Sequence, residues 1–138
     1  MEQRDYILRE IEKIGMVIRA IRQKLFGSPD DLAITVDNQA ETLREMLLDE
    51  AYLDLDELVA LDPTETERYL AGLKGFNTEN IELLAQTLSD IGLNGEAPAS
   101  RPLLEKALQL YEICTLRDRT FSFEREAAVI RIKEVLKG

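Results

Sequence analysis

Aliphatic residues recur along residues 5–26 at the spacing of an amphipathic helix. Successive members of this line are separated by 4, 3, 4, 3 and 4 positions: Ile7, Ile11, Ile14, Ile18, Ile21 and Leu25. With about 3.6 residues per turn, such steps keep every member on one face of a helix. Leu8, Val17 and Phe26 widen that face, while charged residues occupy the far side. The pattern predicts a long helix over 5–26 whose apolar face is sealed against neighbouring helices.

Helix start and stop signals divide the rest of the chain. Each predicted start has a side chain able to accept a hydrogen bond from the first turn: Ser28, Asp54, Asp62, Asn77 and Ser100. Pro29 and Pro63 follow two of these caps at the first helical position, where proline is favoured. A second helix is therefore expected from Pro29, and a turn is expected around Tyr52 before a short helix.

These signals predict about seven helices and no credible strand. The chain of 138 residues is long enough for one core, with about two thirds of the surface of the extended chain buried on folding. We expect an all-α, single-domain bundle over residues 1–138. It would consist of the long helix 5–26, acidic helices over 29–73 and repeat-like helices over 77–137, with sequence neighbours packed antiparallel.

The last three helices have predicted apolar residues, which form an inner face in the first two. In the first of them the inner residues are Ile81, Leu84, Ala85, Leu88 and Ile91 or Gly92. In the second they are Leu104, Ala107, Leu108, Tyr111 and Cys114 or Ile113. The third carries the apolar residues Phe121, Phe123, Ala127, Ile130 and Val135. We expect Phe121 and Phe123 to anchor this final helix.

The net charge of −10 is concentrated in one block. Residues 28–67 hold one basic and thirteen acidic residues, a charge of −12, whereas residues 101–138 hold eight and six, a charge of +2. Such a block repels nucleic acids and anionic membranes, because binding to phosphates needs Lys and Arg. It is either a solvated, solubilising face or a docking surface for a basic partner.

Other features of the composition indicate a cytoplasmic protein. A single cysteine, Cys114, fits a reducing compartment. The first residues are acidic where a secretory signal is basic and then apolar, and no stretch is apolar enough to cross a membrane. We therefore expect neither nucleic acid nor membrane as a partner.

Catalytic and cofactor-binding patterns are missing from the sequence. The chain contains no histidine, which is the commonest general base and transition-metal ligand. Cys114 lies in an apolar helical stripe and is expected to be a buried core residue. No phosphate-binding glycine loop is present, so no cofactor is predicted.

An acidic turn over residues 49–57 is a candidate cation site. Asp54, Asp56 and Glu57, with two acids just before them, could surround a cation if the turn brought them together. They do not form a calcium loop, because Leu58 and Val59 stand where a further ligand and a glycine are required. Capping of the short helix by Asp54 is the simpler interpretation.

Two further residues are candidates for interaction. Met16 lies opposite the apolar line of the first helix and is expected to be exposed, where it could mark a second contact surface with Tyr6 and Ala20. Arg125 stands at the start of the last helix among charged residues. We expect it to pair with a neighbouring acid, with a binding role as the alternative.

Residues 76–118 resemble a tetratricopeptide repeat. Ala107, Tyr111 and Cys114 have the small, aromatic, small spacing of the second helix of that repeat, and Ile81, Leu84, Ala85 and Leu88 are similar to its first helix. This resemblance implies a repeat-like helical hairpin. The N-terminal residues 5–12 are also similar to the start of small, uncharacterised bacterial helical proteins, which implies no activity.

The functional prediction is a non-enzymatic module that binds another protein or self-associates. The near-coiled-coil spacing over 5–26 and the repeat-like hairpin favour it. The first alternative is a regulatory or sensor protein that binds a small ligand or cation at the acidic turn 49–57. The second alternative, which has the least support, is an enzyme that uses carboxylates alone.

Overall fold

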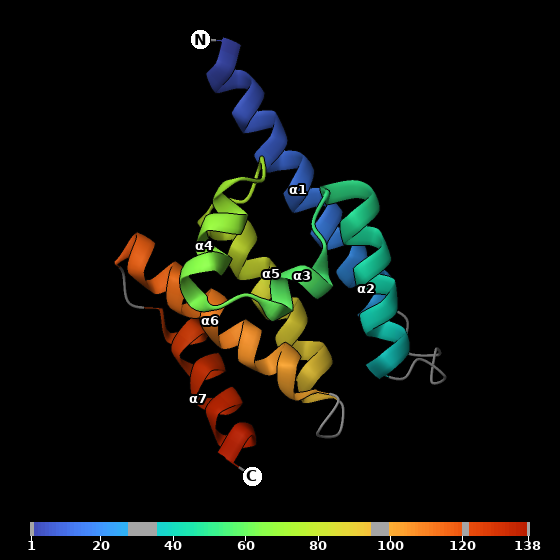
Figure 1. Cartoon of the computed structure of the whole chain (residues 1–138), viewed down its shortest axis with the longest axis vertical. Helices are drawn as coiled ribbons and strands as arrows, with labels where there is room; N and C mark the ends of the chain where they lie inside the picture. Colours follow the sequence, from blue (N-terminus) through green and yellow to red (C-terminus); the bar gives the residue numbers. More distant parts are fainter. Residues whose placement is uncertain (1, 28–35, 95–99, 120–121, 138) are drawn as a thin grey trace.

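The fold is all-α, as predicted. The computed structural model describes residues 2–27, 36–94, 100–119 and 122–137, and these ranges contain seven helices and no strand. The helices are α1 (Glu2–Phe26), α2 (Val36–Ala51), α3 (Leu55–Ala60), α4 (Pro63–Ala71), α5 (Thr78–Leu93), α6 (Arg101–Asp118) and α7 (Phe123–Lys137). They form one bundle around a common apolar core (Figure 1). The predicted start of α2 at Ser28 and Pro29 lies outside the described residues.

The C-terminal part of α1 is a central element of the core. Ile14, Ile18, Ile21 and Leu25 are buried, and this part of the helix packs against α2 and α5. Burying each such side chain contributes about 1.5–3 kcal/mol, so the predicted apolar line stabilises the bundle here. The prediction that this stretch is sealed is confirmed from Ile14 onward.

Polar contacts fix the position of α1 along α5. Asn80 is buried and its Nδ2 donates to the carbonyl oxygen of Ile11 at 2.8 Å and to that of Gly75 at 2.7 Å. About three turns further along α1, Arg22 donates to Thr87 Oγ1 at 3.0 Å and to Asp90 at 2.6 Å. Because α1 is bonded at two positions along its axis, it cannot slide along α5 without losing hydrogen bonds to partly buried groups.

The first turns of α1 were wrongly predicted to be sealed. Ile7 is 55% exposed and Leu8 is 52% exposed, and the helix continues outward past the other helices (Figure 1). The part of α1 that other residues cover ends at the α4–α5 loop, where Gly75 adopts a φ of +91° and lies against the backbone of Glu10. A Cβ atom at Gly75 would lie 2.5 Å from the Glu10 carbonyl oxygen, so this close approach requires glycine.

Helices α5 and α6 make the most extensive helix pair. Their predicted inner faces are buried except for Leu108, which is half-buried, and both members of the two open alternatives, Ile91 with Gly92 and Cys114 with Ile113, are buried. A Cβ atom at Gly92 would lie 2.7 Å from the side chain of Leu104, so the absence of a side chain permits the close approach of the two helices. The likeness of this hairpin to a tetratricopeptide repeat stays a prediction.

Three of the predicted caps are confirmed. Asp54, Asp62 and Asn77 each accept a hydrogen bond from the backbone three residues later, and Asp62 forms a full capping box with Glu65. Ser100 was wrongly predicted as a cap of this kind. It has a helical backbone conformation (φ −81°, ψ −22°) and makes no side-chain capping bond, because a cap residue normally needs an extended backbone to reach the first turn.

The predicted anchoring of α7 by Phe123 is wrong. Phe123 is 82% exposed, Ala127 is exposed, and Ile130 and Val135 are half exposed, while Phe121 lies outside the described residues. The side chains that turn inward share a helical spacing: Arg125, Ala128, Val129, Ile132 and Leu136. This face was missed because it begins with a charged residue.

A buried lysine joins α6 to α3 and α4. Lys106 is 2% exposed, and its ammonium donates to the Leu61 carbonyl oxygen at 2.9 Å, Thr66 Oγ1 at 2.7 Å and Gln109 Oε1 at 2.6 Å. Burial lowers the pKa of Lys106, and the nearby Asp62 partly opposes that shift. All three donors of the ammonium are used by neutral acceptors.

Candidate functional site

The projecting end of α1 presents an apolar surface to solvent. Every side chain from Arg4 to Arg9 is exposed, and three consecutive residues within this range are apolar or aromatic. We call Tyr6, Ile7 and Leu8 the α1 end surface; their exposed fractions are 45%, 55% and 52%. Exposed large apolar side chains that lie this close together along one helix are typical of a contact surface.

A contact between Tyr6 and Lys74 connects this end of α1 to the α4–α5 loop. Lys74 Nζ donates to the Tyr6 hydroxyl oxygen at 3.0 Å and lies 4.8 Å from the centre of the ring. The hydrogen bond with Tyr6 is the main cause of a raised pKa of Lys74. Hollows lie beside this contact, and Tyr6 and Lys74 line both of them.

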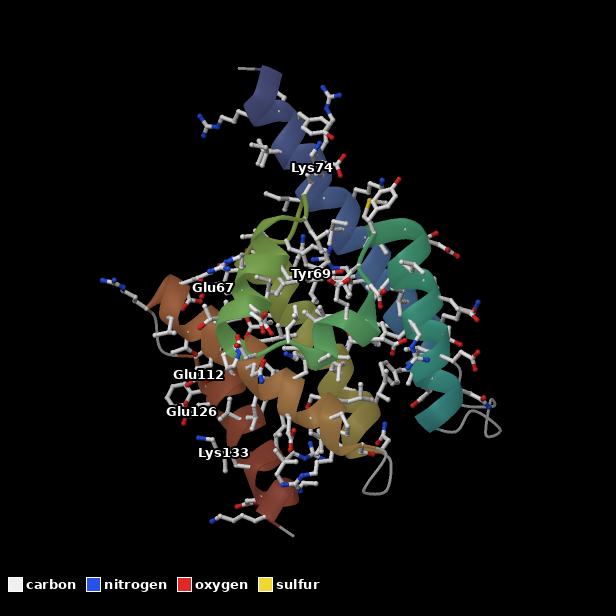
Figure 2. The ribbon with its side chains drawn as sticks, viewed as in Figure 1. Glu67, Tyr69, Lys74, Glu112, Glu126 and Lys133 are labelled. Atoms are coloured by element: carbon white, nitrogen blue, oxygen red, sulfur yellow. The ribbon has the colours of Figure 1, made fainter. Side chains whose placement is uncertain are left out.

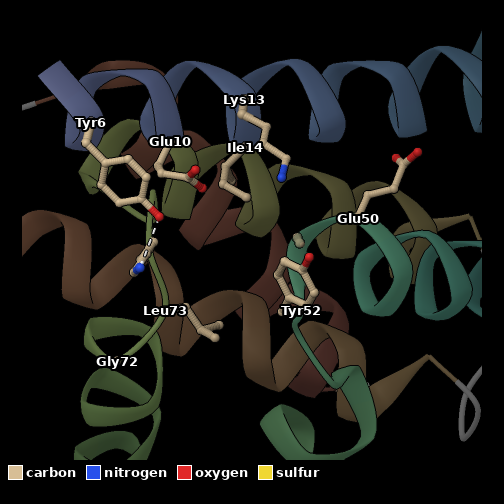
Figure 3. Close-up of a pocket in the computed structure, with 10 residues that line it drawn as sticks. Tyr6, Glu10, Lys13, Ile14, Glu50, Tyr52, Gly72 and Leu73 are labelled. Atoms are coloured by element: carbon tan, nitrogen blue, oxygen red, sulfur yellow. Dashed lines mark hydrogen bonds between the residues drawn. The ribbon is translucent and has the colours of Figure 1, made fainter.

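The first groove, of about 410 Å³, runs between α1 and the α2–α3 turn (Figure 3). Lys13 from α1 and Tyr52 from the turn face each other there, with the ammonium 5.8 Å from the ring centre. Tyr52 directly follows α2, is 73% exposed and has a φ of 57°. A left-handed conformation is costly for a bulky residue and is more often occupied by glycine after a helix.

The second groove, of about 430 Å³, is more apolar. Ile7, Ala71, Leu73 and Gly75 line it together with the Tyr6–Lys74 pair. Ile7 belongs both to the wall of this groove and to the α1 end surface. The exposed stripe on the helix therefore leads directly into a hollow that can accept an apolar side chain.

The acidic turn 49–57 does not assemble into a cation site. Asp54 caps α3, Asp56 pairs with Arg44 at 2.9 Å, and Glu57 is exposed. Of the five acids within residues 49–57, only Glu50 lines the first groove. In the part of the chain that the structure describes, no group of three or more acidic or thiol side chains could hold a metal ion.

The two other candidate residues have different surroundings. Met16 is 68% exposed, which confirms its predicted exposure. Arg125 is 6% exposed and all five of its N–H groups donate, to Glu82, Asp118 and Thr115. Hydrogen bonds to Glu82 and Asp118 raise the pKa of Arg125. Pairing of Arg125 with an acid is confirmed, and no N–H of this guanidinium remains for a ligand.

Sequence reasoning did not identify the residues that shape the grooves. Nothing in the sequence around Lys74 marks it as a partner of Tyr6, which is 68 positions away. Tyr52 gave a faint signal, because a large residue stands at the end of a helix where glycine is common. The buried Cys114 was predicted correctly, and burial raises the pKa of its thiol to about 12.

Comparison with known proteins gives no further assignment. No protein-family model matches the chain, and neither a curated protein nor a solved structure matches it. Within the described ranges, none of the helices has the length and apolar character needed to cross a bilayer.

Proposed function

We propose that this chain is a non-enzymatic module that binds another protein through the α1 end surface and the second groove. The observation that carries the proposal is the continuation of one apolar helix face beyond the bundle. From Ile14 onward the face is buried, and at its outer end Ile7 and Leu8 each expose about half of the side chain. Covering these side chains would remove apolar surface from water, which favours association.

The chemistry of this region suits a protein partner. Ile7 stands between the exposed stripe and the apolar second groove, so a partner helix could cover the stripe while one of its side chains fills the groove. The charges around the patch balance, because Arg4 and Arg9 are matched by Asp5 and Glu10. Such a neutral rim favours neither nucleic acid nor a strongly charged peptide.

Site-specific photo-crosslinking tests the proposal. A photoreactive amino acid would replace Leu8 in one variant and Leu48 on α2 in another; these residues are 52% and 51% exposed. We expect a discrete adduct with a second protein in cells from position 8 and none from position 48. Adducts of equal yield from both positions, or none from position 8, would contradict the proposal.

A matched substitution separates binding from folding. Ile7→Glu should abolish the adduct formed from position 8 and leave the melting temperature within about 2 °C of the wild type, because exposed substitutions usually change stability by less than about 0.5 kcal/mol. The adduct persisting in this variant would show that the contact lies elsewhere.

A second candidate function is recognition of a small ligand in the first groove. The exposed ring and the left-handed backbone of Tyr52 favour it, since backbone strain is often found at ligand-binding sites. The groove offers two tyrosine rings, two lysines and the carboxylates of Glu10 and Glu50, a set suited to an aromatic compound that carries both polar and charged groups rather than to a bare cation. A screen of aromatic carboxylates by thermal shift would test it, with Tyr52→Gly as the control expected to lose any response.

A further inference from the structure

The first groove has an apolar floor between two aromatic rings. Ile14, Ala51 and Leu73 form the floor, and the first two of these residues are buried. The rings of Tyr6 and Tyr52 stand on either side of it (Figure 3). A hollow of about 410 Å³ with this lining can accept a planar apolar ring, which would pack against a tyrosine ring at its side.

The backbone of Tyr52 holds its ring beside the groove under strain. Its φ of 57° lies in the left-handed region, which a bulky residue rarely adopts. The Leu53 amide donates to the Leu47 carbonyl oxygen at 3.1 Å, so α2 is closed at this turn, where glycine is the usual residue. Packing of the core does not explain the tyrosine, because its ring is 73% exposed. Strain that is retained for an exposed ring indicates a ligand that contacts the ring.

Two of the charged side chains that line the groove act on each other, and two do not. Lys74 lies beside α1 (Figure 2), and its pKa is raised mainly by the hydrogen bond to Tyr6, with the charge of Glu10 contributing in the same direction. Lys13 extends into the groove from α1 and Glu50 from the end of α2. In the described part of the chain, neither of them forms an ion pair of 4.0 Å or less. An ammonium and a carboxylate that share a groove without pairing are both open to a ligand.

We propose that the first groove binds a zwitterionic aromatic compound, with the chemistry of a free aromatic α-amino acid. The ligand ammonium bonds to the Glu50 carboxylate, the ligand carboxylate bonds to the Lys13 ammonium, and the ligand ring packs against Tyr52 over the apolar floor. An ammonium and a carboxylate on one carbon match the opposite charges of Glu50 and Lys13. This inference rests on the second candidate function, recognition of a small ligand in the first groove, and names the class of that ligand.

Fluorescence anisotropy of free L-tryptophan measures the binding. The chain contains no tryptophan, so the indole emission comes from the ligand alone. Titration with the whole chain, up to about 1 mM, should give a dissociation constant of about 0.1–1 mM, as expected for a small ligand in an open groove. L-phenylalanine should compete at similar concentrations. Phenylpropionate lacks the ammonium and phenethylamine lacks the carboxylate, so each should compete about fivefold more weakly.

Matched variants assign the two charges and the ring. Lys13→Gln should weaken phenylalanine about fivefold and leave phenethylamine unchanged, because phenethylamine has no carboxylate. Glu50→Gln should weaken phenylalanine equally and leave phenylpropionate unchanged. Lys24→Gln on α1 and Glu45→Gln on α2 remove the same charges at exposed positions outside the groove and should change no affinity. Tyr52→Gly should abolish binding without lowering the melting temperature, because glycine fits the left-handed backbone.

Three results would overturn the proposal. An unchanged anisotropy of tryptophan up to about 1 mM chain would exclude the site. Phenylpropionate binding as tightly as phenylalanine, and only while Tyr52 is present, would leave ligand recognition in the groove intact but refute the zwitterion. Binding of phenylalanine that Lys13→Gln and Glu50→Gln both leave unchanged would lie elsewhere on the chain. Circular dichroism melting of each variant checks that the fold is retained, since these positions are exposed.

Discussion

Replacing Arg125 with methionine should weaken the docking of α7 more than loss of its exposed Phe123 ring would. Among the described residues of α7, Ile132 is the only fully buried aliphatic one, and Ala128, Val129 and Leu136 pack against the core only in part. Arg125 makes four charge-assisted hydrogen bonds of 2.8–3.2 Å to Glu82 on α5 and Asp118 on α6. The guanidinium therefore connects three helices.

The magnitude follows from what the substitution leaves behind. The side chains of Glu82 and Asp118 are 24% and 29% exposed, so their carboxylates remain largely sheltered and lose their counter-charge. Breaking a buried pair costs about 3–5 kcal/mol and an exposed pair less than about 1 kcal/mol. These sites lie between the two limits, and we expect Arg125→Met to lower the free energy of unfolding by about 3 kcal/mol.

Urea denaturation measures this loss. With an m-value of about 1.5–2 kcal/mol/M, the midpoint should fall by about 1.5–2 M. Arg131→Met, at an exposed arginine on the same helix, should change the free energy by less than about 0.5 kcal/mol. Adding Glu82→Gln to Arg125→Met should recover about 1 kcal/mol by removing one uncompensated charge. A loss below about 1 kcal/mol for Arg125→Met, or an equal loss for Arg131→Met, would refute the reasoning.

Three further predictions concern buried groups. Lys106→Met should cost about 2 kcal/mol, because it removes charge-assisted hydrogen bonds to three acceptors. Burial lowers the pKa of Lys106 in the folded state below its ordinary value of 10.5. As the pH approaches 10.5, the unfolded chain therefore binds more protons than the folded chain, and the free energy of unfolding rises with pH. Urea midpoints measured from about pH 7 to 10 should show the wild type gaining stability relative to the Lys106→Met variant. Gly75→Ala should lower the melting temperature by several degrees, since a Cβ atom would meet the Glu10 backbone, while Gly72→Ala, with no atom nearer than 3.5 Å, should not. The Cys114 thiol, with its pKa raised to about 12, should resist a disulfide reagent at pH 8 and react at once in urea; rapid reaction of the folded protein would contradict its burial.

Local signals in the sequence were sufficient to predict that the chain is helical and where most of its helices begin. Asp54, Asp62 and Asn77 cap their helices because each bond spans only three residues, so no distant contact is needed to form it. The apolar period of α1 likewise identifies its inner face, which Ile14 and Ile18 confirm. What a period cannot indicate is how far neighbouring helices extend along that face. The exposure of Ile7 therefore could not be read from the sequence.

The errors at α7 and at the candidate site have a common physical cause. The period of α7 fits two faces, and hydrophobicity favoured the one with Phe123 and Ile130. The packed face instead begins with Arg125, whose burial depends on acids 43 and 7 positions away. The contact of Tyr6 with Lys74 depends in the same way on a distant loop. Pairings of this kind are set by tertiary packing, which hydrophobic periodicity does not encode.

The 25 residues of α1 span about 37 Å as a single uninterrupted helix, clamped near its middle by Asn80 and near its far end by Arg22. The exposed N-terminal part of the helix is therefore held at a fixed angle to the bundle. A protein bound to this exposed part would have one orientation relative to the bundle. A force that bends the exposed part would act first on the hydrogen bonds of Asn80. The length and direction of the exposed helix are thus fixed before a partner binds, which lowers the conformational entropy lost on binding.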